Sequence, residues 1–125
     1  MSQKVLIADD EAYIRLLIEQ TLEEFEDQGV EVLTANNGAE ALQMIQDEEP
    51  DLVFLDVMMP KMNGYEVCKT VKQDLKMEDV YIVILTAKGQ EFDRQRGEQV
   101  GADLYMTKPF DPDELIELTG KVLAV

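Results

Sequence analysis

The chain has 125 residues, of which 46% are apolar, and a formal net charge of −16. This length suits one globular domain, and we expect residues 1–125 to form it. The acidic excess would repel a nucleic-acid backbone, so direct nucleic-acid binding is not expected. No apolar run approaches the roughly 20 residues of a membrane span, and the first residues do not form a signal peptide. A cytoplasmic protein without membrane contact is therefore predicted.

Apolar runs predict five strands, each followed by a helical pattern. The strands are expected near residues 4–8, 30–35, 51–55, 80–85 and 103–107. The first, third and fourth runs are continuously apolar, whereas the second and fifth are mixed, so the latter two are expected at the sheet edges. This pattern predicts an α/β fold. It is a doubly wound, five-stranded parallel sheet in the order 2-1-3-4-5, flanked by five helices and flavodoxin-like.

Amphipathic patterns and capping pairs place the helices. The apolar face of the first helix comprises Ile14, Leu17, Ile18, Leu22 and Phe25, and that of the last comprises Leu115, Leu118 and Val122. Three later helix starts are marked by Asn37 with Glu40, Asn63 with Glu66, and Asp111 with Pro112 and Glu114. Residues 87–97 contain few apolar side chains and an internal glycine that costs about 1 kcal/mol in a helix. The fourth helix is therefore expected to be short and marginal.

Histidine is absent and there is one cysteine, Cys68. A single cysteine cannot form an internal disulfide, and its helical spacing from Val71 predicts packing in the core. The absence of histidine removes the commonest zinc ligand and the commonest general base. Without histidine, no phosphohistidine can form within the chain. If the chain takes part in phosphoryl chemistry, the phosphoryl group must therefore come from a donor outside it.

Polar residues follow four of the predicted strands, and the carboxyl ends of parallel strands meet in one crevice. They are Asp9 and Asp10 after the first strand, Asp56 after the third, Thr86 after the fourth and Lys108 after the fifth. Three neighbouring carboxylates repel one another unless they hold a cation, and oxygen ligands without Cys or His indicate Mg²⁺. Simpler explanations exist for single residues: Asp10 as a helix cap, Lys108 as a surface lysine and Thr86 as an ordinary strand residue.

With their neighbours, these residues form motifs. The motifs are Asp9-Asp10, then Asp56-Val57-Met58-Met59-Pro60 with Gly64, Leu85-Thr86-Ala87, and Lys108-Pro109-Phe110. On these motifs the chain resembles a two-component response-regulator receiver domain, from Lys4 to about Leu123, and in particular the single-domain chemotaxis regulators. The resemblance implies a phosphorylation-activated switch rather than an enzyme.

The resemblance also implies residue roles. Asp56 would be the phosphoacceptor, and Mg²⁺ would be bound by Asp10, Asp56 and the Met58 carbonyl, with Asp9 acting largely through water. Lys108, the Thr86 hydroxyl and the Ala87 amide would contact the phosphoryl group, and the Lys108–Pro109 bond would be cis. Tyr105 would turn inward when the threonine moves, although a half-exposed strand tyrosine is a strong alternative explanation for this residue.

The implied donor is a sensor histidine kinase or a histidine phosphotransfer protein. Phosphorylation would alter the face formed by helix four, strand five and helix five, and so control a downstream protein. No residues remain for an effector domain, so the output is expected to run through protein contacts by a monomer or weak dimer. Met58 replaces a more polar residue of the chemotaxis regulators, and slower hydrolysis of the phosphorylated form is therefore expected.

Other classes of protein offer alternative interpretations of the sequence. The serious alternative is a receiver-fold docking module that works without phosphorylation. An aspartyl phosphatase of the dehalogenase type needs an acid at position 58, which is methionine. The acidic first loop would repel the FMN phosphate of a flavodoxin-like carrier, and the loop after Asp56 lacks the spaced oxygen ligands of a calcium module.

Overall fold

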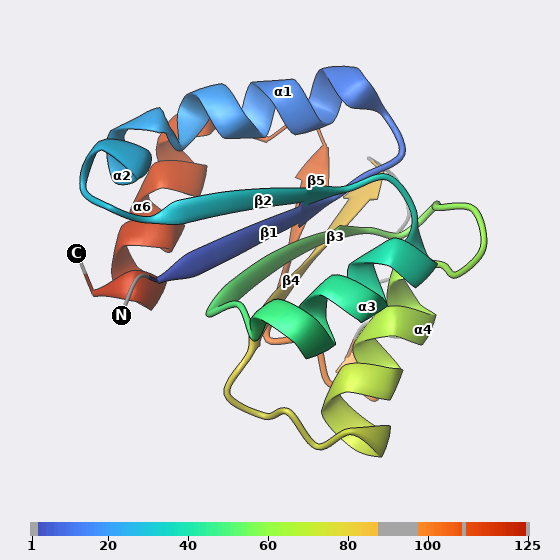
Figure 1. Cartoon of the computed structure of the whole chain (residues 1–125). Coiled ribbons are helices and arrows are strands. Elements are labelled where there is room, and N and C mark those ends of the chain that lie inside the picture. Colours follow the sequence, from blue (N-terminus) through green and yellow to red (C-terminus); the bar gives the residue numbers. More distant parts are fainter. Residues whose placement is uncertain (1–2, 88–97, 109, 125) are drawn as a thin grey trace.

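The computed structural model describes residues 3–87, 98–108 and 110–124. Five parallel strands form one sheet in the order β2-β1-β3-β4-β5 (Figure 1). The strands are β1 (Lys4–Ala8), β2 (Glu31–Ala35), β3 (Leu52–Asp56), β4 (Tyr81–Ala87) and β5 (Leu104–Lys108). The predicted order is confirmed, and the strand bounds agree with the predicted ranges within a residue or two.

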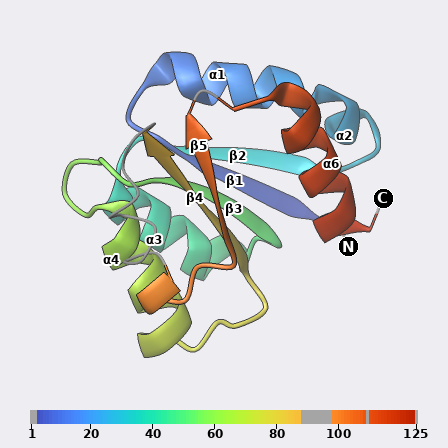
Figure 2. The same cartoon turned by 180° about the vertical axis from the view of Figure 1, so that it is seen from behind.

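Burial of the strands explains why the order could be predicted. β3 is buried along its whole length and β1 nearly so, whereas β2 and β5 keep partly exposed side chains. A central strand is covered on both faces and paired on both sides, which selects a continuous apolar run. β2 and β5 lie at opposite edges of the sheet, as expected (Figure 2).

Helices cover both faces of the sheet. They are α1 (Ala12–Thr21), α2 (Glu23–Asp27), α3 (Gly38–Glu48), α4 (Gly64–Lys69), its π-helical continuation η1 (Thr70–Asp74), and α6 (Pro112–Leu123). α1 and α6 pack on one face, while α3 and α4 pack on the other (Figures 1 and 2). The predicted doubly wound, flavodoxin-like architecture is confirmed. Residues 88–97, which include most of the segment expected to form a marginal fourth helix, lie outside the described residues.

Two apolar cores result from the alternation of side chains along each strand. In β1, Val5 and Ile7 join the core beneath α1 and α6, whereas Leu6 and Ala8 join the core beneath α3 and α4. Cys68 lies fully buried in the second core, as predicted. Burial raises the pKa of its thiol to about 12, so the thiol stays protonated and unreactive.

The three predicted helix starts are confirmed by hydrogen bonds. The Asn37 side chain accepts from the backbone N–H of Glu40, and the Asn63 side chain accepts from that of Glu66. The Glu66 carboxylate also accepts from the Asn63 N–H, which completes a capping box. Asp111 caps α6 by accepting from the N–H of Asp113. These caps fix where α3, α4 and α6 leave the ends of their strands.

The first helix differs from the prediction of one continuous apolar face. α1 ends at Thr21, and the separate turn α2 begins at Glu23. The Thr21 hydroxyl donates to the carbonyl of Leu17 at 2.8 Å, a contact that bends helices. Leu22 and Phe25 are nevertheless buried. The apolar set was therefore predicted correctly, but its placement on one unbroken helix was wrong.

The π-helical turn η1 was not anticipated. The Leu75 N–H donates to the carbonyl of Thr70, five residues earlier, at 2.8 Å. Within this turn, Lys72 forms an ion pair with Asp103 at 2.9 Å and donates to the carbonyl of Val80. The turn is thereby tied to the beginnings of β4 and β5.

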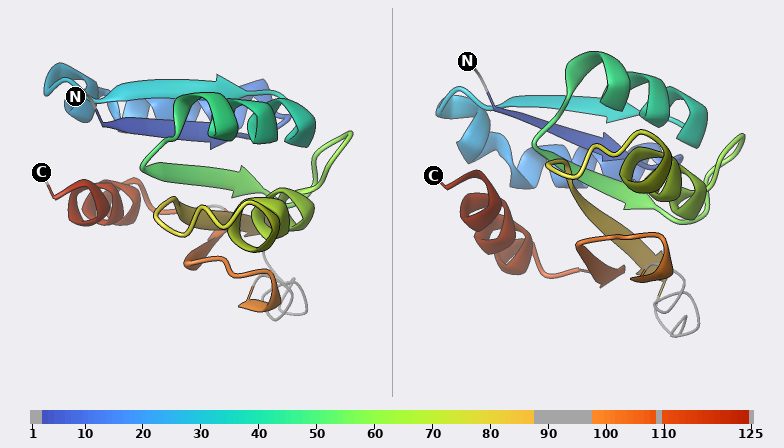
Figure 3. Two further views of the ribbon diagram at one scale, coloured as in Figure 1. Left: turned by 60° about the horizontal axis from the view of Figure 1, so that its bottom comes forward. Right: turned by 90° about the horizontal axis from the view of Figure 1, so that it is seen from below.

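The two ends of the described chain meet at the amino ends of the strands (Figure 3). The Gln3 side-chain amide donates to the carbonyl of Leu123 at 2.8 Å. The carboxyl ends of the strands, with Asp9 and Asp56, lie on the opposite side. Within the described ranges, no helix is both long enough and apolar enough to span a membrane.

Candidate functional site

The predicted polar residues converge on the carboxyl edge of the sheet. Asp9 directly follows β1, Asp56 ends β3, Thr86 and Ala87 end β4, and Lys108 ends β5. Parallel register brings these ends together, since Asp56 pairs with Leu85 and Ala87 pairs with Lys108. The expected crevice therefore forms at the point where the strand order reverses between β1 and β3.

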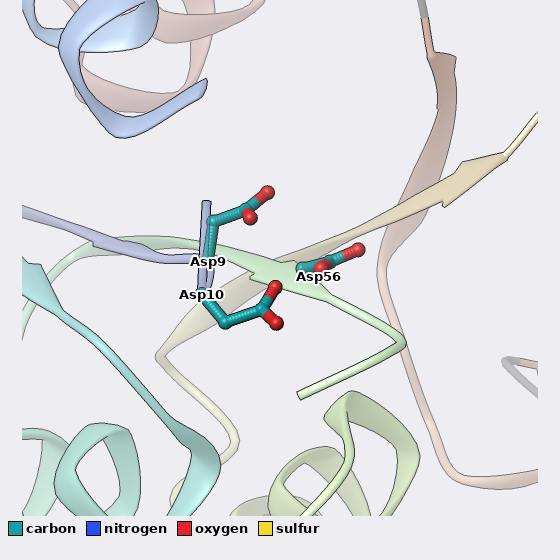
Figure 4. Close-up of side chains that lie close together, drawn as sticks. All are labelled: Asp9, Asp10 and Asp56. Carbon is teal, nitrogen blue, oxygen red and sulfur yellow. The ribbon is translucent and has the colours of Figure 1, made fainter. Parts of the chain in front are cut away.

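Three carboxylates form the centre of this edge. One oxygen each of Asp9, Asp10 and Asp56 lies within 4.8 Å of the other two. Figure 4 shows the three side chains gathered beyond the ends of β1 and β3. Asp9 and Asp56 are buried, whereas Asp10 is exposed. An all-oxygen donor set with three negative charges, open to solvent on one side, fits a hard cation that retains water ligands, such as Mg²⁺.

Lys108 bridges two of these carboxylates. Its ammonium nitrogen lies 2.8 Å from Oδ2 of Asp9 and 3.1 Å from Oδ1 of Asp56. Burial lowers the pKa of Lys108, but the hydrogen bond to Asp9 and the charge of Asp56 outweigh it, so the pKa is raised. Lys108 is therefore a cation of the site and not a surface lysine.

Asp56 is buried beside another acid, and its pKa is raised from 3.8 to about 6. Burial is the largest cause, and the negative charge of Asp9 adds to it. The charge and hydrogen bond of Lys108 act in the opposite direction without cancelling the effect. Among the described residues, the resting site thus holds more negative charge than Lys108 neutralises.

The turn after β1 is held by two backbone contacts. Oδ1 of Asp9 accepts from the N–H of Glu11 at 2.9 Å, and the Arg15 guanidinium donates to the carbonyl of Asp9 at 2.6 Å. Glu11, rather than Asp10, occupies the position before α1, without a side-chain cap. The explanation of Asp10 as a helix cap is therefore excluded. Arg15 was not predicted from the sequence, where its only signal is that it is the one basic residue of α1.

Thr86 and Tyr105 lie on the neighbouring strands β4 and β5. Thr86 is buried, and its hydroxyl donates to the carbonyl of Met106 at 3.4 Å. Tyr105 is half-buried, and its hydroxyl lies 3.3 Å from a carboxylate oxygen of Glu98. Its predicted movement stays a prediction. Pro109 lies outside the described residues, and so does the predicted cis bond.

The loop after β3 borders an open pocket of about 650 Å³ next to the acid cluster. Its lining residues are Asp10, Met58, Met59, Pro60, Lys61, Met62, Asn63 and Glu66. Two glycines allow this loop to pack closely against the start of α3 and the end of β3. A Cβ on Gly38 would overlap the carbonyl oxygen of Met62, and one on Gly64 would overlap that of Asp56.

Comparison with known proteins places these residues in a family context. Residues 5–119 match the response regulator receiver domain family. The chain is 48% identical over 115 residues to the alkaline phosphatase synthesis transcriptional regulatory protein PhoP of Bacillus subtilis, covering 92% of the chain and 46% of PhoP. It is 43% identical over 123 residues to the phosphate regulon transcriptional regulatory protein PhoB of Pseudomonas aeruginosa, covering 98% and 52%. The chain thus spans about half the length of the curated relatives it matches.

Solved structures agree over the whole fold. A putative response regulator from Chloroflexus aurantiacus is 35% identical, with a TM-score of 0.87 and complete coverage of both chains. The chemotaxis response regulator CheY4 of Vibrio cholerae is 36% identical, with a TM-score of 0.83 and coverage of 98% of this chain and 99% of that one.

Proposed function

Because the chain belongs to the response regulator receiver domain family, we propose that it is a phosphorylation-activated switch whose phosphoacceptor is Asp56. The choice of Asp56 among the three acids rests on one observation. Asp56 ends the central strand β3, with Asp9 and Asp10 after β1 on one side and Thr86 of β4 on the other, and Lys108 lies 3.1 Å from its Oδ1. A phosphoryl group on Asp56 would therefore meet a cation on one side and the metal-binding acids on the other.

Each neighbour has a role in the proposed transfer. A carboxylate oxygen of Asp56 attacks the phosphorus of a phosphohistidine in a kinase or phosphotransfer protein. The P–N bond breaks, its electron pair leaves with the imidazole nitrogen, and an acyl phosphate forms on Asp56. Lys108 exchanges its contact with Asp56 for one with a phosphoryl oxygen, and the Thr86 hydroxyl and Ala87 amide donate to the others. This step needs positioning and charge stabilisation but no proton-shuttling base.

Mg²⁺ is the proposed cofactor, held by Asp10, Asp56 and the Met58 carbonyl, with Asp9 acting largely through water. When bound, it would neutralise charge on the incoming phosphoryl oxygens. The raised pKa of Asp56 supports this proposal, since excess negative charge around a buried carboxylate favours cation binding.

The proposed output is a change in protein contacts, without turnover of a substrate. Movement of Thr86 toward the phosphoryl group would let Tyr105 turn inward and would alter the surface around β5. The downstream partner is a protein that recognises this surface. The proposed location is the cytoplasm, where a kinase can draw its phosphoryl group from ATP; cell fractionation would test it.

Acetyl phosphate with Mg²⁺ provides a test that needs no cognate kinase. Intact-mass spectrometry should detect one phosphoryl group on the wild-type chain and none on Asp56→Asn. Asp79→Asn, an exposed aspartate outside the site, is the matched control and should behave as wild type. Absence of phosphoryl addition to the wild type would favour the alternative, a docking module that works without phosphorylation.

A further inference from the structure

Met58 is an exposed thioether in the pocket that adjoins the acid cluster. Its relative exposure is 69%, the highest of any large apolar residue in the described chain except Tyr13. It lies two residues after Asp56 and shares the adjoining pocket with Asp10. Packing therefore does not explain this side chain, and its sulfur is accessible to small molecules in solution.

The other methionines in the described part of the chain are better protected. Met59 and Met106 are 8% and 4% exposed, and Met44, Met62 and Met77 are partly covered. Oxidation of a thioether requires access to its sulfur, so exposure sets the order of reaction. Because Met58 and Met59 are neighbours in sequence and differ in exposure, they form an internal comparison.

We propose that Met58 is an oxidative modification site that couples peroxide or hypochlorous acid to the lifetime of the phosphorylated state. With hydrogen peroxide, the sulfur lone pair attacks one peroxide oxygen and the O–O bond breaks. The new S–O bond gives methionine sulfoxide, and the displaced hydroxide takes the proton of the transferred oxygen to leave as water. The sulfur loses two electrons and the peroxide gains two. The lesion is reversible by methionine sulfoxide reductases.

Oxidation of Met58 would make the wall of the pocket more polar and give it a hydrogen-bond acceptor for water. A thioether is an apolar obstacle and a weak acceptor, whereas a sulfoxide oxygen is polar and accepts hydrogen bonds well. Placed next to the phosphoryl group of Asp56, this oxygen can orient a water molecule for attack on phosphorus. Oxidation should therefore shorten the phosphorylated lifetime. This consequence rests on the proposed function, but the modification itself does not.

The modification is tested by limited treatment with hydrogen peroxide, followed by peptide mass spectrometry of every methionine. Met58 should oxidise about tenfold faster than Met59 and Met106, and faster than Met62. Equal rates for Met58 and Met59 would overturn the proposed site. This measurement requires no phosphorylation, so it holds even if Asp56 proves not to accept a phosphoryl group.

The coupling is tested by the decay of the acetyl-phosphate-labelled chain before and after oxidation, each variant being compared with its own untreated form. Oxidation should shorten the lifetime of the wild type severalfold. It should do the same in Met62→Leu, which retains Met58, but should leave the lifetime of Met58→Leu unchanged. An equal response of Met58→Leu, or no response of the wild type once Met58 is oxidised, would overturn the coupling.

Discussion

Replacement of Asp56 by asparagine should stabilise the fold, and the gain should depend on pH. Asp56 is 6% exposed, and its pKa is raised from 3.8 to about 6, mainly because burial disfavours the charged carboxylate. The folded state therefore holds this proton more tightly than the unfolded chain does. The associated stability is fully present below pH 3.8 and is lost as the pH rises through about 6.

The magnitude follows from the two pKa values. A difference of about two units corresponds to about 3 kcal/mol of unfolding free energy. About 2 kcal/mol of this total is expected to be lost between about pH 4.5 and about pH 7.5. Asp56→Asn removes the titrating group, so its advantage over the wild type should grow by this amount across that range. Carboxylates remote from Asp56 are common to both proteins and cancel in the comparison.

Urea denaturation at several pH values, with EDTA to remove divalent cations, measures this difference directly. Asp79→Asn serves as the control, because it removes one exposed aspartate and should show no such trend. A difference between Asp56→Asn and wild type that stays constant within about 0.5 kcal/mol over the pH range would refute the reasoning.

Three further outcomes are expected. Mg²⁺ at about a hundred times its Kd should raise the unfolding free energy of the wild type by about 2.7 kcal/mol, and this gain should be greatly reduced in Asp10→Asn. If thermal melts show that Mg²⁺ stabilises the wild type and Asp10→Asn equally, Asp10 is not a ligand. Met58→Asn should shorten the phosphorylated lifetime, because a carboxamide orients water where the thioether obstructs it; an unchanged decay rate would count against this role. Lys72→Met should lower the unfolding free energy, measured by urea denaturation, by about 2 kcal/mol, since it leaves Asp103 without the lysine that lies 2.9 Å away. If the variant is as stable as the wild type, η1 does not depend on this ion pair.

Much of the site could be predicted because it depends on strand order. Continuous apolar runs before Asp9 and Asp56 placed these residues on adjacent central strands, and parallel register then brought their ends together. The caps at Asn37 and Asn63 could be predicted equally well, because the interaction is local and spans three residues.

Two of the features that were missed depend on contacts between distant residues. Strand order predicted Lys108 in the same crevice as the acids, but not its bridge between Asp9 and Asp56, since the bridge depends on side-chain geometry. Likewise, the ion pair that ties the π-helical turn to Asp103 spans thirty-one residues and has no local signal in the sequence. The bend at Thr21 was missed because its hydroxyl forms an optional bond to the backbone.

The close contact between Gly38 and Met62 has a consequence for building hybrid proteins. The first residue of α3 touches the backbone of the loop that carries Met58, and the Gly38 N–H lies 3.4 Å from the carbonyl of Pro60. Helix α3 and the segment 57–63 are therefore one transplantable unit, although they are separated in sequence by the whole of β3. A chimera that imports α3 with a larger first residue but keeps the native loop would displace the pocket wall. If both were imported together, that wall would be preserved.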